Sequence, residues 1–510
     1  MKKDVKNIKK ALISHRTMQA SDRAKDVEIG QVLNSDVVND NYVGLYSKGM
    51  THDATTGVAD ESLIKELQIA MKSGEQADFD DLNKGGARKQ ASPQGGLSQE
   101  NMGGDPEGFT MPPAPALASR QAAAEMVEVY EKALLRDKTF SEINEGGVDV
   151  DADRAVANLN AFGSDFKGGK QSGSVNRKVL FRGSEPGTQV GPYISQLLYH
   201  PVPFGAHTIT QQYKQRTGVY GITEANWLSI QNGNIPVAQT LGSNRYAATP
   251  RDLGSLDHVD FVYQQLLYGA LILMGRPRQS AFPTLAKEDR FITNGGGPDV
   301  GCAVTEIARH ALKAAWVQKW RHHLKLRPET MAGRVVKEMD GALPVGTVHA
   351  DLISSSTIDA VKAANLAAGG DNKAFLALLY AEGSPTHPAY PAGHAAISGA
   401  CVTIIKLYIA DGAWSSTGLA AVESIDGSSL RSYAGADASS MTIHGELNKL
   451  AANIATGRNI AGVHYRSDGD EGMKLGEKVA IQWFKDLREQ QNEEIGSVSI
   501  VKFDGTTEVV

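Results

Sequence analysis

The stretch SPTHPAYPAGHAAISGACVTIIKLYIA, from Ser384 to Ala410, joins a proline-rich loop to a long apolar segment. Pro391 suits the first turn of a helix, where its missing N–H costs nothing, and Gly393 lets the backbone approach a ligand closely. The first N–H groups of a helix have no partner within it and carry the positive end of its dipole, so they bind anions. We therefore predict an anion site at this helix start, with His394 exchanging protons beside it. A capping or packing histidine is the alternative.

Helix-period apolar positions recur on both sides of this stretch. Further helices are predicted at 61–73, 116–135, 257–275, 304–324, 358–369, 372–381, 394–410, 444–463 and 472–493. Strand signals are few. The exception is the tail 497–510, where Asp504-Gly505 joins two β-branched runs and predicts a hairpin. The fold class is mainly α, with helices packed as bundles.

Composition divides the chain into three regions. We predict an N-terminal arm with a Gly/Pro-rich loop (1–115), a helical-bundle catalytic domain (116–490) and a C-terminal β-hairpin tail (491–510). Residues 86–115 are rich in Gly, Pro, Ser and Gln and lack an apolar period, which is typical of an extended loop. Because the arm has few apolar positions for a core of its own, we expect it to pack in subunit contacts.

Charge and hydropathy exclude several classes of partner. The net charge of -6 and the isoelectric point near 6.1 argue against a nucleic-acid or anionic-membrane partner. The basic N-terminus has no apolar core of signal-peptide length, and the apolar stretch 266–275 is too short to span a bilayer. We therefore expect a soluble, cytoplasmic protein.

A lysine and an arginine lie at the end of one predicted helix. An apolar stripe at four-residue spacing runs from Ile307 to Ala315, and Lys319 continues it, so this lysine leaves the apolar face. Pro328 disfavours helical geometry at the residue before it, so the helix should end near Arg327. The two long side chains could converge on one oxyanion. The alternative is that Lys319 extends to solvent.

A third cluster holds Arg458, His464 and Asp468. Asp468 lies four positions after His464, about one helical turn, and could orient the imidazole. The planar fork of Arg458 suits tetrahedral oxyanions. Together the clusters supply one Lys, two Arg, two His and a helix start, which is more positive charge than a buried site tolerates without an anion. A phosphate-like group with three or four oxygens would match it.

Three strings in this order resemble a family signature. KWRHHLKLRPE, PAGH and GRNIAGVHYRSD look like the three-part signature of the vanadium-dependent haloperoxidases and the related acid phosphatases, over roughly 300–480. The string SPTHPAYPAGHA, the Lys-to-Arg spacing and the upstream LYSKGMTHD look most like the red-algal and cyanobacterial bromoperoxidases.

The resemblance implies that the cofactor is vanadate. Lys319, Arg327 and Arg458 would hold vanadate oxygens together with the backbone N–H of Gly393, and His464 would bind vanadium itself. A structural divalent cation is a further candidate cofactor.

The resemblance also implies catalytic roles. His394 would be the acid–base residue in peroxide activation and also touch the cofactor, His387 would lie near the halide, and Lys319 would act in catalysis as well as binding. Ala392 stands where the family has a serine, and Gly457 replaces a second serine. Because one neutral hydrogen bond contributes about 0.5–1.5 kcal/mol, we still expect vanadate to bind.

The implied function is a haloperoxidase that uses hydrogen peroxide to oxidise halide, with bromide and iodide favoured, to hypohalous acid, which halogenates small organic substrates. The resemblance also implies a homo-oligomer, with a dodecamer favoured. Two alternatives remain open: an acid phosphatase in which His464 attacks phosphate and His394 protonates the leaving group, and a non-catalytic assembly protein.

Overall fold

The computed structural model describes residues 31–100, 102–276, 280–282, 285, 287–493 and 496–510, with residues 10 and 14 isolated before them. Most of the predicted arm before residue 31 thus lies outside the described residues. The first helices of this part are α2 (Ser35–Val38), α3 (Glu61–Ser73), α4 (Gln76–Asp80), α5 (Arg120–Leu134), α6 (Phe140–Asn144), α7 (Val150–Ala161), α8 (Glu224–Gln231), α9 (Pro250–Leu256) and α10 (Gln264–Met274). They are followed by α11 (Gly297–Val317), α12 (Pro328–Met339), α13 (Ala350–Ile353), α14 (Ser356–Ala367), α15 (Gly393–Tyr408), α16 (Ile443–Ile460) and α17 (Arg466–Gln490).

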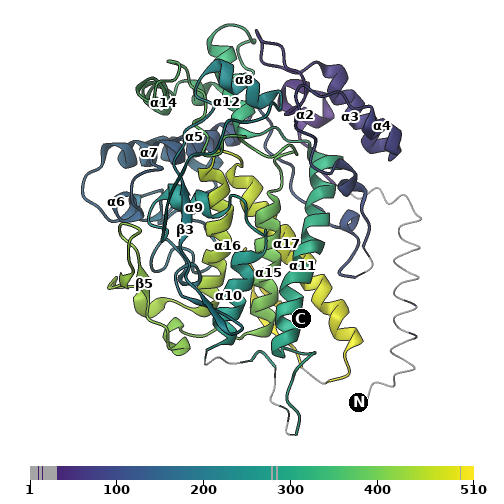
Figure 1. Ribbon diagram of the computed structural model, residues 1–510, viewed down its shortest axis with the longest axis vertical. Coiled ribbons are helices and arrows are strands. Elements are labelled where there is room, and N and C mark those ends of the chain that lie inside the picture. Colours follow the sequence, from purple (N-terminus) through teal and green to yellow (C-terminus); the bar gives the residue numbers. More distant parts are fainter. Residues whose placement is uncertain are drawn as a thin grey trace.

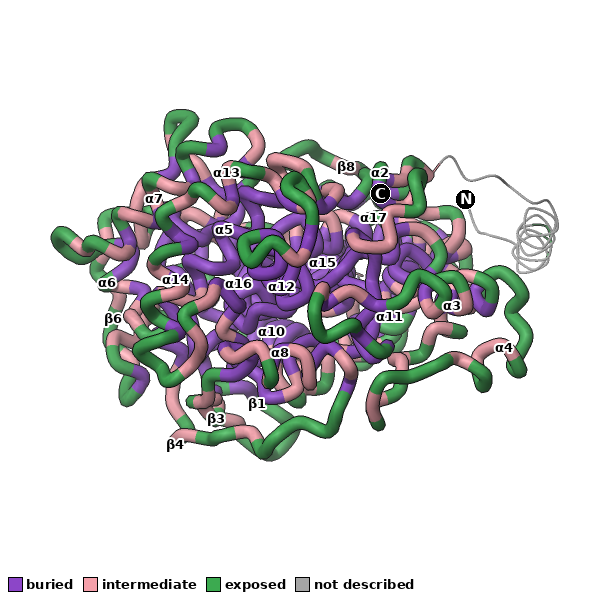
Figure 2. Tube along the Cα trace, turned by 90° about the horizontal axis from the view of Figure 1, so that it is seen from above, coloured by how far each residue is buried: buried purple, intermediate pink, exposed green. Residues whose placement is uncertain are grey.

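Helix α15 is the centre of the bundle. It packs against α11, α16 and α17, and these helices stand side by side with α10 (Figure 1). All its residues except His394 are buried, as expected of a helix that is apolar on all sides. Figure 2 shows α15, α16 and α12 within the buried interior. The predicted mainly α, bundled fold is confirmed.

Glycines allow α15 and α17 to approach closely. A Cβ added to Gly476 would lie 1.9 Å from the carbonyl oxygen of Ala396, and one added to Gly399 would lie 2.1 Å from that of Met473. Real Cβ atoms do not come so near, so only glycine fits these positions. This crossing fixes the start of α15 relative to the start of α17.

The strands form four small antiparallel pairs. The pairs are β1 (Val202–Phe204) with β2 (His207–Ile209), β3 (Tyr213–Arg216) with β4 (Leu241–Arg245), β5 (Val422–Glu423) with β6 (Arg431–Ser432), and β7 (Ser499–Val501) with β8 (Thr507–Val509). The last pair confirms the hairpin predicted around Asp504-Gly505. The Phe503 backbone N–H donates to Glu477, which attaches the hairpin to α17.

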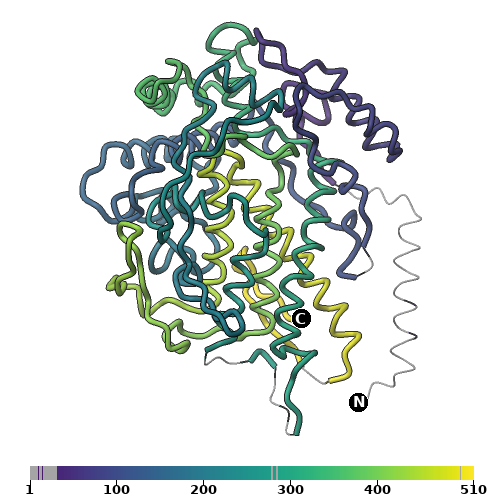
Figure 3. The backbone as a smooth tube through the Cα atoms, in the orientation of Figure 1, coloured from purple at the N-terminus to yellow at the C-terminus, as the bar shows by residue number. Residues whose placement is uncertain are grey.

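The N-terminal segment, residues 35–100 and 102–115, packs on the helical bundle of its own chain. Tyr46, Ile64 and Leu67 form a small apolar cluster with Trp320 and Leu324. The described residues of 86–115, all but residue 101, contain only short 3-10 turns, as predicted for an extended loop. Figure 3 shows the earlier part of the N-terminal segment, in purple, at one end of the molecule. The role of 1–115 in subunit contacts stays a prediction.

Two helix predictions are wrong. The helix predicted at 257–275 begins only at Gln264, because Val259 has a left-handed φ of 63° that turns the chain after α9. The segment predicted as a helix at 372–381 is irregular. There Leu378 exchanges backbone hydrogen bonds with Tyr220, and Leu379 donates to a carbonyl at the end of α16, so tertiary partners replace those of a helix.

No helix among the described ranges is long and apolar enough to cross a membrane.

The close helix crossing predicts opposite effects for two Gly→Ala substitutions. Gly476→Ala should lower the free energy of unfolding by about 1–3 kcal/mol or more, because the added methyl overpacks the crossing. Gly301→Ala in α11, where a Cβ meets nothing within 4 Å, should raise it by about 0.5–1 kcal/mol. Urea unfolding measures both, and equal effects would contradict the proposed crossing.

Candidate active site

The first two cations of the site, Lys319 and Arg327, follow the end of α11. After Val317 the helix continues as a π-helical turn, Gln318–His323, and ends at Leu324, whose φ of 41° is left-handed. Such turns often occur at functional sites. The wider turn carries Lys319 into the interior, where it is fully buried. Arg327 follows in extended conformation as the N-cap of α12, so helical geometry ends slightly earlier than predicted.

The start of α15 lies beside them. The helix begins at Gly393, two residues later than Pro391 suggested, because Ala392 is extended and its N–H donates to Asp468 at 2.8 Å. The Tyr390–Pro391 bond is cis. No side chain caps this helix, so its first N–H groups remain available to an anion.

Helices α16 and α17 supply the third cluster. Arg458 lies in the last turn of α16, and His464 lies in the short connection to α17. The predicted contact is present, since Nδ1 of His464 lies 2.9 Å from Oδ2 of Asp468. The same carboxylate accepts from the Tyr465 N–H and lies 3.2 Å from Lys325, so it is held rigidly.

Three of these cations have no carboxylate partner. Lys319, Arg327 and Arg458 form no ion pair with any residue that the structure describes, although each is at most 4% exposed. Lys319 donates only to carbonyl oxygens, those of Pro388 and Ala389, at 2.8 and 2.9 Å. Burial, reinforced by Arg327, holds the pKa of Lys319 well below its ordinary value.

The hydrogen bonds of the Arg458 guanidinium group to described residues come from one nitrogen, Nη1. Its Nη1 donates to the carbonyl of Asp257 at 2.7 Å and to the hydroxyl of Tyr380 at 3.2 Å. Its Nε is buried without a partner. A buried donor left unpaired is costly, so this nitrogen is available to an added acceptor.

Arg327 contacts His387 and His464, two of the three predicted site histidines. It donates from Nε to the His387 carbonyl at 2.8 Å and from Nη1 to the Val463 carbonyl at 2.7 Å. Its Nη1 also lies 2.9 Å from Nε2 of His464. Arginine only donates, so Nε2 of His464 carries the lone pair and Nδ1 carries the proton shared with Asp468. This is the tautomer that can ligate a metal through Nε2.

The surroundings of His464 and His387 disfavour the protonated form of each ring. Burial lowers the pKa of His464 and of His387 well below the ordinary value, and the neighbouring Arg327 and Lys319 lower both further. Burial is the larger cause, and the part of the lowering that comes from Arg327 and Lys319 reflects positive charge that a bound anion would balance.

His394 has a carboxylate partner that sequence reasoning missed. Its Nε2 lies 3.1 Å from Oδ1 of Asp260, and burial followed by Arg458 lowers its pKa. The left-handed turn at Val259 directs Asp260 to this position. The helix pattern at 257–275 hid that turn, and no spacing rule relates 260 to 394.

Trp316 is a second residue that sequence reasoning missed. Its ring lies 4.8 Å from that of His387 and 5.8 Å from Nζ of Lys319. It precedes Lys319 by three positions on one helix face, a signal that could have identified it.

Every predicted site residue thus converges on one buried region. The residues are Lys319, Arg327, His387, Ala392, Gly393, His394, Arg458 and His464. Unpaired cations, an unpartnered arginine nitrogen and a free helix start together fit a tetrahedral oxyanion. Vanadate is such an anion, and its oxygens would accept hydrogen bonds from these donors. Within the described part of the chain, no group of three or more His, Cys, Asp or Glu residues could hold a metal ion, so the structural divalent cation stays an untested prediction.

Comparison with known proteins is consistent with this geometry. The family model of the VCPO second helical-bundle domain matches residues 302–493. The chain is 31% identical to a vanadium-dependent bromoperoxidase of Corallina pilulifera, over 92% of each chain. It is also 31% identical to one of Ascophyllum nodosum, over 86% of this chain and 81% of that one.

A solved structure extends the likeness to the whole fold. The homohexameric second vanadate-dependent bromoperoxidase of Ascophyllum nodosum superposes with a TM-score of 0.88 at 25% identity, over 98% of this chain and 89% of that one. With relatives of this identity and coverage, and with a site built to hold an oxyanion beside a histidine, the chain belongs to the vanadium-dependent bromoperoxidase family.

Proposed function

We propose that this protein is a vanadate-dependent haloperoxidase that uses hydrogen peroxide to oxidise halide, bromide and iodide above chloride, to hypohalous acid, which halogenates small organic substrates. The observation that carries the proposal is the set of three buried cations without carboxylate partners, beside a neutral histidine that presents Nε2. Like charges that are buried close together destabilise a fold unless a counter-charge is present. Arg327 and Arg458 both act electrostatically on Lys319, so this set favours a resident anion.

The cofactor would be held by residues of all three motifs. Lys319, Arg327 and Arg458 would bind vanadate oxygens with the N–H of Gly393, and Nε2 of His464 would bind vanadium. When bound, vanadate supplies a Lewis acid that activates peroxide without a change of oxidation state. Asp468 holds the proton on Nδ1 of His464 and keeps Nε2 directed at the ligand.

His394 is suited to move the proton of the peroxide. Its side chain is 17% exposed, more than those of the other predicted site residues, so substrates can reach it. Because its pKa is lowered by burial and by Arg458, it is neutral at pH 7 and can accept a proton. The Asp260 carboxylate then stabilises the imidazolium and can orient the ring.

His387 and Trp316 form the other wall of the site. We infer that halide approaches between this pair and His394, because a tryptophan face beside Lys319 gives an apolar surface next to a positive charge. A large, weakly hydrated anion such as bromide suits that environment better than a small one.

Removing the axial nitrogen tests the function. His464→Ala should lose stable vanadate binding and halogenation of monochlorodimedone, because no other motif residue presents an unprotonated nitrogen at this position. Equilibrium dialysis with vanadate and the peroxide-dependent assay measure the two effects.

The control is His200→Ala, another buried histidine, which bonds Ala420 outside the three motifs and should behave as wild type. Halogenation by His464→Ala at the wild-type rate would contradict the site. Hydrolysis of phosphate monoesters without haloperoxidase activity in the wild type would favour the phosphatase.

Ala392 should influence halide preference. It is the fully buried N-cap of α15, where a serine hydroxyl could bond a cofactor oxygen. Lacking that bond, the enzyme should activate peroxide less strongly and oxidise little chloride. Ala392→Ser should change the bromide-to-chloride ratio of kcat/KM by about 2- to 12-fold, the equivalent of one hydrogen bond.

Its effect on the free energy of unfolding should stay within about 2 kcal/mol, the range of an N-cap change. Steady-state kinetics with each halide test the predicted influence of Ala392 on halide preference. Efficient chloride oxidation by the natural enzyme would contradict this prediction, and so would unchanged halide kinetics in the Ala392→Ser variant.

The protein should also form a homo-oligomer. The similar Ascophyllum nodosum enzyme is homohexameric, and the red-algal resemblance favours a dodecamer. Large apolar side chains such as Ile235, Phe261 and Ile292 are more than 70% exposed and would be covered in an assembly. Light scattering after size exclusion should give a multiple of 54.5 kDa, with twelve favoured over six. A monomer would contradict the proposal.

A further inference from the structure

Lys48 lies in the N-terminal segment and reaches the interior of the catalytic domain. Its side chain is fully buried, as is that of its partner Glu329, with 2.5 Å between Nζ and Oε1. Burial lowers the pKa of Lys48 to about 8, against the opposing pull of Glu329, so the ammonium is still charged at neutral pH. The two residues of this buried ion pair lie 281 positions apart in the sequence. The pair therefore joins the N-terminal segment to helix α12.

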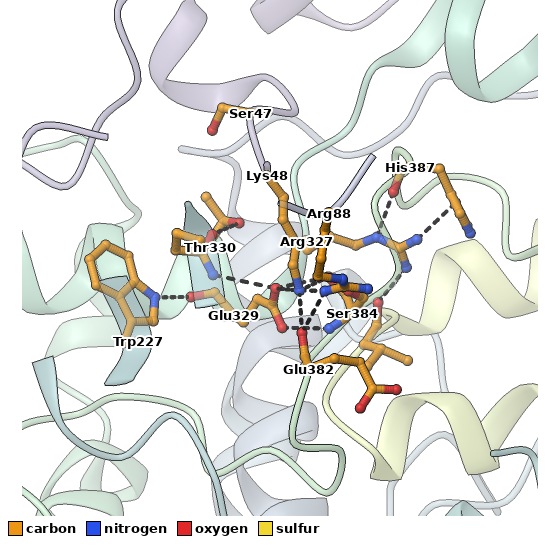
Figure 4. A network of polar contacts seen from close by, with 12 residues as sticks. Ser47, Lys48, Arg88, Trp227, Arg327, Glu329, Thr330, Glu382, Ser384 and His387 are labelled. Carbon is orange, nitrogen blue, oxygen red and sulfur yellow. Dashed lines mark hydrogen bonds and ion pairs between the residues drawn. The ribbon is translucent and has the colours of Figure 1, made fainter. Parts of the chain in front are cut away.

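The same ammonium binds the loop that leads to His387. Nζ donates to the carbonyl of Glu382 at 2.9 Å and to that of Ser384 at 2.5 Å. Glu329 accepts from the N–H and the hydroxyl of Ser384 at 2.8 and 2.9 Å. Figure 4 shows the ammonium between Glu329 and this loop.

These contacts close a ring of residues that includes Arg327 and His387 of the predicted site. Glu329 lies two residues after Arg327, and Ser384 lies three residues before His387. Arg327 in turn donates to the carbonyl of His387 at 2.8 Å and lies 2.9 Å from its Nδ1. The start of α12 and the loop 384–387 are therefore joined at both ends, by Arg327 at one and by Lys48 with Glu329 at the other.

Neighbouring residues of the N-terminal segment bind the same loop. Arg88 donates to the carbonyl of Glu382 at 3.0 Å, and the N–H of Ala91 donates to that of Thr386 at 2.7 Å. Three carbonyls of the loop, those of Glu382, Ser384 and Thr386, thus have their partners in the N-terminal segment.

We propose that Lys48 is a positioning residue for the anion site: it fixes the loop before His387 against the start of α12, and so sets the placement of Arg327. The inference rests on the proposed function, since it takes vanadate as the anion. Lys48 touches neither cofactor nor substrate, and it acts through Glu329 and the loop carbonyls.

The test is the dissociation constant of vanadate, measured by isothermal titration calorimetry on folded protein. Lys48→Met should raise it about 10- to 100-fold, the usual effect of removing a group that orients a ligand. Because this variant leaves Glu329 buried and unpaired, the double variant Lys48→Met/Glu329→Gln is also measured. It has no unpaired charge, yet should bind weakly too, since methionine donates nothing to the loop.

Arg334→Met is the matched control. Arg334 is a fully buried cation of the same helix α12 and donates to carbonyls of the same N-terminal segment, those of Val43 and Gly57. It has no hydrogen bond to the loop 382–387 among those recorded for the described residues. Its loss should lower the melting temperature and leave the vanadate dissociation constant near the wild-type value.

The possible results distinguish a failure of the positioning role of Lys48 from a failure of the proposed function. Wild-type vanadate affinity in a folded Lys48→Met protein or in the double variant would overturn the positioning role, even with a lower melting temperature. Equal weakening in Arg334→Met would also overturn it, because any loosening of the segment would then suffice. A wild-type protein that binds no vanadate would overturn the proposed function and the inference with it.

Discussion

Three positive side chains, Lys319, Arg327 and Arg458, are buried together without a carboxylate partner among the described residues, and the rest of the site follows from that constraint. Desolvated cations of like charge repel one another and are tolerated only where carbonyl groups and an anion compensate them. The protein supplies the carbonyls from the loop before α15 and from the connection between α16 and α17. An anion is the partner that we propose for the positive charge that remains.

The helical bundle fixes the positions of these groups relative to one another. Glycines in α15 and α17 allow the two backbones to touch, and the N–H of Ala392 then meets the carbonyl of Asp468. The helix start that we propose for the anion is thereby attached to Asp468, whose carboxylate contacts His464. The N-terminal segment completes the enclosure from outside the bundle, through Lys48 and Glu329. A region that composition marks as polar and extended thus contributes to the geometry of the site.

The three motifs were predictable because each combines residue types whose chemistry is specific with a spacing that a helix imposes. His464 and Asp468, one turn apart, and the Gly-His pair at a helix start are examples. Asp260 was not predictable, because a left-handed residue, Val259, interrupts an apparently continuous helix pattern. The π-helical turn at Lys319 and the irregular segment near Leu378 also escaped prediction, since tertiary partners rather than local propensity determine them. Lys48 stood within the string LYSKGMTHD, yet nothing local reveals that its partner is Glu329.

The most direct measurement is a crystal structure of the protein loaded with vanadate, with vanadium located by its anomalous scattering. The account predicts one vanadium site per chain, within bonding distance of Nε2 of His464, with its oxygens in hydrogen-bond contact with Lys319, Arg327 and Arg458. Vanadium bound elsewhere, or bound here while these three side chains point away from it, would contradict the claim that the unpaired cations form the cofactor site.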